Sequence, residues 1–332
     1  MFGLSSASTS KRMPRIIEVR GLTRKYGDLV AVDRVEFSVD RGEIFAFLGP
    51  NGAGKSTTVR MLTGYIPPTA GAVIVAGHDL LHHPGAARQH FGVVPEEANV
   101  YADLTVWQNV MLMAELHGLS SRKRRQNGQH LIELFGLADR SAQKGRQLSK
   151  GLRQRLMLCM ALVSDPEILF LDEPTSGLDV ASSRLIRKVI VEMNRDRGMT
   201  VFLTTHNIEE ADEICHRVSI INKGRIAAID TPQALRATVH SRRSVEARFA
   251  EQQASPPEEM LNFGPGTETV QLAHGFRIFG TDPGRIAQEL AARATAGGYR
   301  IAHICTLEPS LEEVFLHIVG RGTPARASEI HA

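Results

Sequence analysis

The sequence predicts an α/β fold, in which a mainly parallel sheet is covered by helices, followed by a second, small α+β domain. Short apolar runs alternate with longer amphipathic stretches from residue 16 to about residue 231, which is typical of such a sheet. After Pro232 the character of the sequence changes, and residues 253–267 are rich in Pro and Gly. A chain of 332 residues with 42% hydrophobic and 23% charged residues is long enough for about two globular domains.

Composition excludes several classes of protein. The 39 Lys and Arg residues and 36 Asp and Glu residues give a formal net charge of +3, which does not suggest a dedicated nucleic-acid binder. The longest apolar run, residues 156–163, is far shorter than the ~18–20 residues of a membrane-spanning helix, so we expect that the chain by itself does not cross a membrane. The widely spaced Cys159, Cys215 and Cys305 form neither a disulfide framework nor a metal cluster, which fits a reducing compartment.

Four strands can be placed in the first domain. Residues 35–39 alternate between apolar and polar, which predicts a half-exposed strand. After a turn, residues 44–48 are continuously apolar, as are residues 168–171 and 201–203, which predicts buried strands. The Ser-rich residues 1–15 lack an apolar core and are expected to form a flexible tail rather than a secretory signal.

Helices are expected between these strands and near the end of the chain. Residues 105–137 are mostly helical in pattern, with a break at 118–121. They contain a basic run, residues 122–125, which we interpret as a solvated helix face; the alternative is a lipid- or nucleic-acid-binding patch. Residues 269–319 carry strand–strand–helix–strand–helix signals. The last helix begins with a capping box, Ser310 to Glu313, and presents one apolar face made of Leu311, Val314, Phe315 and Ile318.

A phosphate-binding loop follows the first buried strand. Residues 49–56 match the pattern G-x-x-x-x-G-K-[ST] between a strand that ends at Leu48 and a helix that we expect to begin at Lys55. Backbone amides of such a loop converge on phosphate oxygens, Lys55 contacts the β- and γ-phosphates, and the Ser56 hydroxyl binds Mg²⁺. The sequence therefore predicts a nucleoside-triphosphate site formed by Gly49, Pro50, Asn51, Gly52, Ala53, Gly54, Lys55, Ser56 and Thr57.

An acidic pair ends the buried strand at residues 168–171. Asp172 is placed to hold Mg²⁺, directly or through water, and Glu173 to polarise the attacking water as general base, an effect worth roughly 10²–10⁴-fold. An acidic pair at a strand end is often only a helix cap, but together with the phosphate loop it predicts a hydrolytic site.

The run Leu148-Ser149-Lys150-Gly151-Leu152-Arg153-Gln154-Arg155 resembles the signature L-S-G-G-Q of the ABC-type ATPase subunits of membrane transporters. This resemblance covers residues 16–231 and implies that two subunits sandwich two ATP molecules head to tail. Ser149 and the backbone at Gly151 open a helix whose N-terminus attracts an anion, which in the family is the γ-phosphate held by the facing subunit. Lys150 and Leu152 depart from the signature, whereas its Ser and second Gly are kept.

The resemblance also assigns roles to four further residues. Tyr26 corresponds to the aromatic residue that stacks on adenine, Asp179 closes a segment, residues 176–179, that couples the two sites, and His206 corresponds to the histidine that senses the γ-phosphate. Glu96 stands where the family usually has a Gln that contacts Mg²⁺ and the attacking water and relays to the membrane partner; Glu97 is the alternative alignment.

The implied architecture is a P-loop NTPase core of the ABC ATPase type over residues 16–235, with an antiparallel β subdomain and a helical subdomain at about 97–165. A small α+β domain at 236–320 and a tail at 321–332 would follow.

One ATPase half with a short C-terminal extension resembles a subfamily that pairs with separate permeases exporting drugs, lipids, polysaccharides or lipo-oligosaccharides. The implied cofactors are ATP and Mg²⁺, and the implied partners are an integral-membrane permease and a second copy or a paralogous ATPase, but no nucleic acid. The chain would then lie at the cytoplasmic face of the membrane. A non-transport ABC ATPase acting on a soluble complex and an unrelated phosphate-loop kinase are the alternatives.

Overall fold

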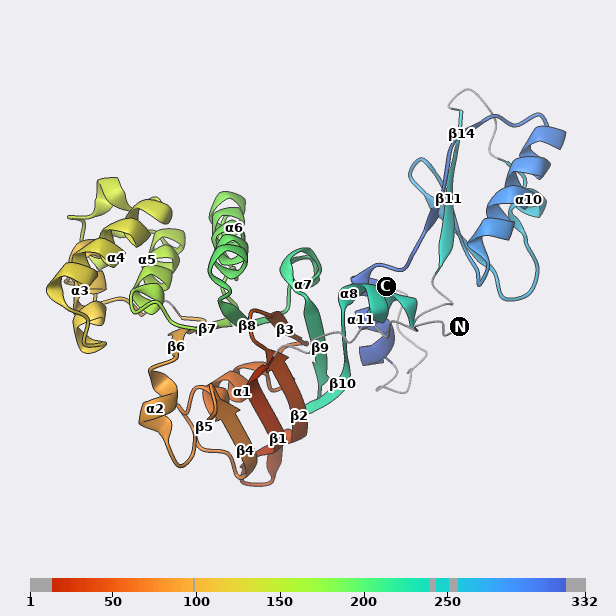
Figure 1. The fold of residues 1–332 in the computed structure, drawn as a ribbon. Helices are drawn as coiled ribbons and strands as arrows, with labels where there is room; N and C mark the ends of the chain where they lie inside the picture. The colour runs from red at the N-terminus through yellow and green to blue at the C-terminus, as the bar shows by residue number, and fades with distance from the viewer. Residues whose placement is uncertain (1–13, 98, 239–242, 251–255, 321–332) are drawn as a thin grey trace, which may run out of the picture. The chain divides into compact units, whose positions relative to one another are not determined.

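The computed structural model describes residues 14–97, 99–238, 243–250 and 256–320. The chain forms two compact units, Met1–Ala227 and Ala228–Ala332 (Figure 1). The boundary predicted at residue 235 falls within α8 (Pro232–Ala237), and the first strand already begins at Arg15. The predicted tails at residues 1–13 and 321–332 lie outside the described residues.

A four-stranded antiparallel sheet, with the order β2-β1-β4-β5, begins the first unit. Its strands are β1 (Arg15–Tyr26), β2 (Leu29–Asp40), β4 (Ala70–Val75) and β5 (His78–Asp79). Residues 35–39 of β2 alternate between buried and more exposed positions, so the predicted half-exposed strand is confirmed. This sheet is the antiparallel β subdomain.

A six-stranded sheet with the order β10-β9-β3-β8-β7-β6 forms the centre of the first unit. The pairings of β3 with β8 and β9, and of β7 with β6 and β8, are all parallel, so these strands end at the same edge. Every residue of β3, β7 and β8 is buried, which confirms the continuous apolar runs as inner strands. The strands are β3 (Ile44–Leu48), β6 (Phe91–Val94), β7 (Ile168–Asp172), β8 (Thr200–Thr205), β9 (Arg217–Asn222) and β10 (Arg225–Asp230).

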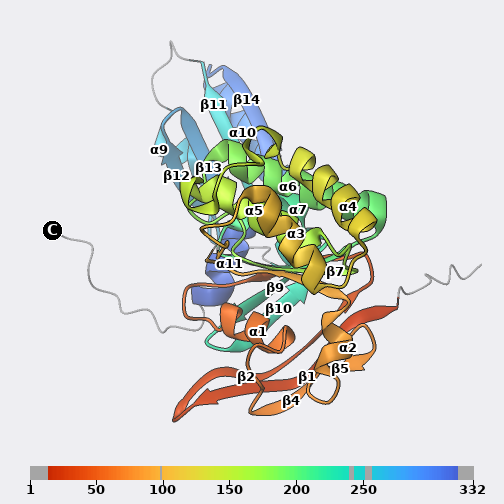
Figure 2. The ribbon, with the colours of Figure 1, turned by 90° about the vertical axis from the view of Figure 1, so that its left-hand side faces the viewer.

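Helices cover this sheet on both sides. In Figures 1 and 2, α5, α6 and α7 lie on one side, and α1 lies on the other side with the antiparallel sheet. Helices α3, α4 and α5 pack together, and the break between α3 and α4 falls at the predicted place, residues 118–121. The bounds are α1 (Lys55–Leu62), α2 (Pro84–Arg88), α3 (Val106–Leu116), α4 (Ser121–Leu134), α5 (Lys150–Leu162), α6 (Val180–Arg197) and α7 (Ile208–Ile214).

The second unit is a four-stranded antiparallel sheet, with the order β12-β13-β11-β14, packed against α10 (Pro283–Ala296). The predicted order strand–strand–helix–strand–helix is confirmed for β12 (Glu268–Leu272), β13 (Gly275–Phe279), α10, β14 (Ile301–Leu307) and α11 (Leu311–Gly320), and β11 (Ser244–Phe249) precedes them. The capping box is also present: the Glu313 amide donates to Ser310 Oγ at 3.1 Å and the Ser310 amide to the Glu313 carboxylate at 2.9 Å.

One part of the predicted loop at residues 253–267 is wrong. Among its described residues, Glu258–Leu261 form the short helix α9, because Met260 and Leu261 are buried in the core that the sheet shares with α10. None of the helices within the described ranges is both long enough and apolar enough to span a bilayer.

Candidate functional site

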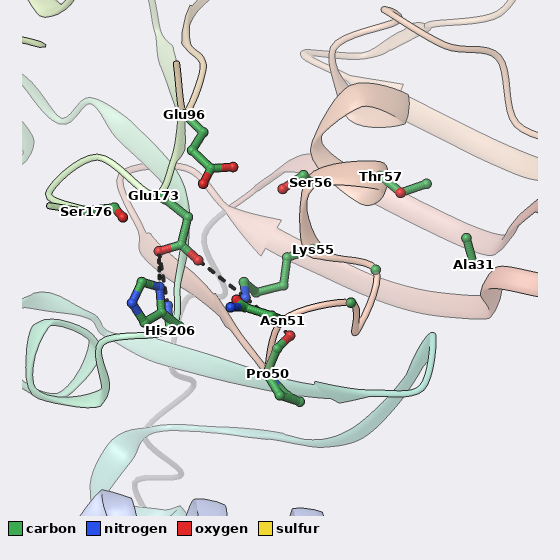
Figure 3. Close-up of a pocket in the computed structure, with 12 residues that line it drawn as sticks. Ala31, Pro50, Asn51, Lys55, Ser56, Thr57, Glu96, Glu173, Ser176 and His206 are labelled. Carbon is green, nitrogen blue, oxygen red and sulfur yellow. Dashed lines mark hydrogen bonds and ion pairs between the residues drawn. The ribbon is translucent and has the colours of Figure 1, made fainter. Parts of the chain in front are cut away.

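A cavity of about 420 Å³ opens where the central strands end (Figure 3). Its walls come from the loop before α1, from α1 itself, and from the segments that follow β6, β7 and β8. The lining residues are Ala31, Pro50, Asn51, Gly52, Gly54, Lys55, Ser56, Thr57, Glu96, Glu173, Ser176 and His206. Parallel sheets of this kind place ligands at their carboxyl edge, so the cavity is the candidate site.

The loop at residues 49–54 requires glycine at its end. Gly54 has a φ of +103°, and a Cβ there would lie 2.6 Å from the carbonyl oxygen of Ala31, so no larger residue fits. Helix α1 then begins at Lys55, as predicted, with its free amides directed at the cavity. Lys55 Nζ donates to the Gly49 carbonyl oxygen at 2.7 Å, which holds the ammonium against the loop. This arrangement suits an anion with several oxygens, such as a triphosphate.

Asp172 lies behind this loop at the end of β7. It is 6% exposed, and its Oδ1 accepts hydrogen bonds from the Ser56 hydroxyl at 3.2 Å and from the Thr204 hydroxyl at 2.5 Å. A hydroxyl and a carboxylate are hard oxygen ligands of the kind that Mg²⁺ takes from proteins, with phosphates and water completing its shell. Within the described ranges no cluster of three or more His, Cys, Asp or Glu side chains could hold a metal alone. The donor set therefore fits a Mg²⁺ that arrives with a nucleotide.

Glu173 is held in the cavity by several contacts. Its backbone has a φ of +51°, a left-handed conformation that is uncommon for a residue other than glycine, and its amide donates to Thr204 Oγ1 at 3.1 Å. One carboxylate oxygen lies 3.3 Å from Lys55 Nζ, and the other lies 2.7 Å from His206 Nδ1 and accepts from the His206 amide at 3.2 Å. The structure thus joins Lys55, Glu173 and His206 in one contact chain (Figure 3).

Glu96 reaches the cavity from the segment after β6. Its side chain extends toward the side of the pocket where Ser56 lies (Figure 3), whereas Glu97 is not among the lining residues. Of the two glutamates left open by the sequence, Glu96 thus shares the cavity lining with Ser56, and Glu97 does not. Both glutamates are exposed.

Ser149, Gly151 and Asp179 form a second group that does not line this cavity. Ser149 caps α5, its hydroxyl accepting from the Leu152 amide at 3.4 Å, and Asp179 caps α6, accepting from the Ser182 amide at 2.8 Å. That backbone hydrogen bond lowers the pKa of Asp179. A Cβ on Gly151 would lie 2.6 Å from Ser182 Oγ, so glycine lets the start of α5 approach α6 closely.

Tyr26 also lies outside the cavity lining. It ends β1, its side chain is 44% exposed, and the Arg24 guanidinium lies 4.6 Å from its ring centroid. Two residues of the phosphate loop, Gly49 and Ala53, are also absent from the lining. They face the protein interior: a Cβ on Gly49 would lie 2.6 Å from the Ile221 carbonyl oxygen, and Ala53 is buried.

Sequence reasoning missed three residues that the structure connects to the site. Thr204 bonds to both Asp172 and the Glu173 amide, and its signal was a threonine at the end of an otherwise apolar strand. Glu210 is a fully buried acid whose Oε1 accepts from Thr175 Oγ1 at 2.9 Å; only its position four residues after His206 marks it. Ala31 lines the cavity from β2 and has no sequence signal at all.

Comparison with known proteins places these features in one family. The sequence model of the ABC transporter family matches residues 32–176. Over 222 residues the chain is 43% identical to a probable multidrug ABC transporter ATP-binding protein of Escherichia coli, a match that covers 67% of this chain but only 38% of that protein. It is 36% identical to a fluoroquinolones export ATP-binding protein of Mycobacterium tuberculosis, covering 97% of this chain and 99% of the relative.

A solved dimeric structure of MJ0796, a bacterial ABC transporter cassette, has the same fold as the first unit. It superposes with a TM-score of 0.61 and 26% identity over 65% of this chain and 98% of the cassette.

Proposed function

This chain belongs to the ABC transporter family, and we propose that it is the ATP-binding and ATP-hydrolysing subunit of an exporter whose permease is a separate chain. The observation that carries the proposal is Glu173, held at the end of β7 between Lys55 and His206 and facing the phosphate loop. A carboxylate at that place is within reach of a water molecule beside the terminal phosphate, as general-base catalysis requires.

The contacts of Lys55 suggest how nucleotide binding prepares the base. Lys55 and Glu173 are 6% and 7% exposed, and their 3.3 Å ion pair fills the place where phosphate oxygens would bind the ammonium. A γ-phosphate would compete for Lys55 and leave Glu173 with His206 as its remaining partner. Glu173 could then accept a proton from the attacking water while the His206 ring keeps the carboxylate oriented. Binding and activation of the base are thereby linked.

Magnesium is the second cofactor that we propose. The Ser56 hydroxyl and Asp172 carboxylate, 3.2 Å apart, would hold the ion together with phosphate oxygens, and Glu96 would add a carboxylate on the open side. The ion supplies charge neutralisation for the phosphates when it is bound.

We further propose that two copies, or this chain and a paralogous ATPase, assemble on ATP. The N-terminus of α5, with Ser149 and Gly151, and the cap of α6, Asp179, lie outside the lining of the chain's own cavity. In the proposed assembly these groups complete the nucleotide site of the facing subunit. The likeness to a dimeric cassette supports this arrangement.

The permease partner is supported by a second cavity of about 490 Å³ in the first unit. Its walls are mainly apolar and come from the end of α1, from β6, and from α3 and α5; Tyr65 at its rim is 79% exposed. Strand β6 connects the two cavities, since its residues 91–93 line this one and Glu96, just beyond its end, lines the nucleotide site. We propose that a permease segment binds here and holds the subunit at the cytoplasmic face of the membrane.

A pair of variants tests the ATPase proposal. Glu173→Gln removes the base and the competing charge on Lys55, so ATP should still bind while hydrolysis slows by about a hundredfold or more. Lys55→Ala removes the phosphate ligand, so ATP binding itself should weaken sharply. Phosphate release and equilibrium nucleotide binding, measured on the same samples, separate the two effects. Hydrolysis by Glu173→Gln at the wild-type rate would exclude Glu173 as the base.

A further inference from the structure

Glu210 is a buried acid that the proposed chemistry does not use. It lies in the first turn of α7, is 0% exposed, and has its own amide bonded to Asn207 Oδ1, the cap of that helix, at 3.2 Å. Its Oε1 accepts a hydrogen bond from Thr175 Oγ1 at 2.9 Å. Burying a carboxyl group is costly unless such partners compensate it.

The partners of Glu210 are close in sequence to Glu173 and His206, whose side chains contact each other. Thr175 is two positions after Glu173, in a turn closed by the hydrogen bond from the Ser176 amide to the Glu173 carbonyl oxygen at 3.1 Å. Asn207, whose Oδ1 accepts a hydrogen bond from the Glu210 amide at 3.2 Å, directly follows His206. Glu210 therefore contacts the loop after β7 through its carboxylate and the loop after β8 through its backbone amide.

The surroundings of Glu210 show the same connection electrostatically. Burial raises the pKa of Glu210 and the charge of Glu173 raises it further, whereas the hydrogen bond from Thr175 and the charge of Arg187 lower it. Arg187 comes from α6 and is itself held by Glu213 of α7 at 3.1 Å. Glu210 thus lies within electrostatic reach of the proposed base.

We propose that Glu210 is a positioning residue, which ties the Glu173 loop to the His206 loop through Thr175 and Asn207. The proposal rests on the function assigned to Glu173 and His206 above. A general base must stay within about 3 Å of its partner and its water, and small displacements lower the rate of the chemical step without loss of substrate binding. The bond between Thr175 and Glu210 restrains the backbone on both sides of the 2.7 Å contact between Glu173 and His206.

The test removes one hydroxyl without changing side-chain shape. Thr175→Val should lower kcat by about tenfold and leave KM for ATP within about twofold, while Thr175→Ser, which keeps the hydroxyl, should keep kcat. Thr200→Val is the control, because the hydroxyl of this buried threonine likewise makes a hydrogen bond, accepting from the Gly42 amide at 2.9 Å, but at the far end of β8 from His206. That control should lower thermal stability and leave kcat unchanged.

Substitutions of Glu210 complete a double-mutant cycle. Glu210→Gln keeps an acceptor for Thr175 and should retain kcat, whereas Glu210→Ala should match Thr175→Val. The double variant Thr175→Val with Glu210→Ala should be no slower than either single variant, because both remove one bond. A Thr175→Val enzyme at the wild-type kcat would overturn the proposal, and so would equal losses in Glu210→Gln and Glu210→Ala. Glu173→Gln in the same assay distinguishes failure of this proposal from failure of the proposed ATPase function. If only the positioning role of Glu210 is wrong, Glu173→Gln still hydrolyses ATP slowly.

Discussion

Glu96 brings a further carboxylate to a pocket that already has Glu173 on its wall and Asp172 behind it. An amide oxygen can ligate a hard cation as a carboxylate oxygen does, but without the charge. Glu96→Gln should therefore retain ATP hydrolysis within about tenfold, measured as phosphate release at saturating Mg·ATP. Glu97→Gln is the control, because this neighbour does not line the cavity and should leave the rate unchanged. Complete loss of turnover in Glu96→Gln would show that the two side chains are not interchangeable here.

The residues of the site differ in how far they could be predicted from sequence. Lys55, Ser56, Asp172 and Glu173 stand in motifs whose spacing reflects a strand end followed by a turn, and the structure brings all four together. Thr204 and Glu210 could not be predicted, because their partners are 32 and 35 residues away and only the pairing of β7 with β8 and the placing of α7 bring them near. Their positions after an apolar strand and after His206 do not by themselves indicate which residues they contact.

Helix α5 begins with a serine, Ser149, that caps the helix and that we also propose to contact the nucleotide of a facing subunit. Ser149→Ala removes the cap of α5 and the hydroxyl offered to the facing nucleotide, so hydrolysis should fall by about tenfold or more. Ser120→Ala is the matched control: Ser120 is also exposed and caps α4 with a comparable bond, 3.5 Å against 3.4 Å. The control should lose a similar amount of stability and none of the phosphate release. Normal hydrolysis by Ser149→Ala would contradict the role of α5 in the sandwich.

Elements with a clear hydrophobic pattern were predicted correctly, whereas the short helix α9 was not. The inner strands β3, β7 and β8 are uninterrupted apolar runs because both of their faces are covered, and the break between α3 and α4 follows from Gly118 at a φ of +73°. Helix α9 was missed because four residues are too few to show a helical period; contacts with the core of the second unit decide its conformation.

Within one molecule, the predicted site residues fall into two groups, one that lines the nucleotide cavity and one that does not. Lys55, Glu173 and His206 meet in the cavity, while Ser149 and Asp179 cap helices outside its lining. The sequence could indicate this division only through family resemblance, since no periodicity or spacing within one chain reports which groups face a second copy. The proposed two-fold assembly on nucleotide would let both groups contribute to the same site.

We propose that ATP joins two such chains and that Glu173 is then the base in its hydrolysis. This assembly can be tested by the mass of the Glu173→Gln protein in solution, measured by light scattering during gel filtration with and without Mg·ATP. With hydrolysis blocked, we predict a monomer without nucleotide and a stable dimer with Mg·ATP. A Glu173→Gln protein that binds Mg·ATP and still elutes as a monomer would contradict the account.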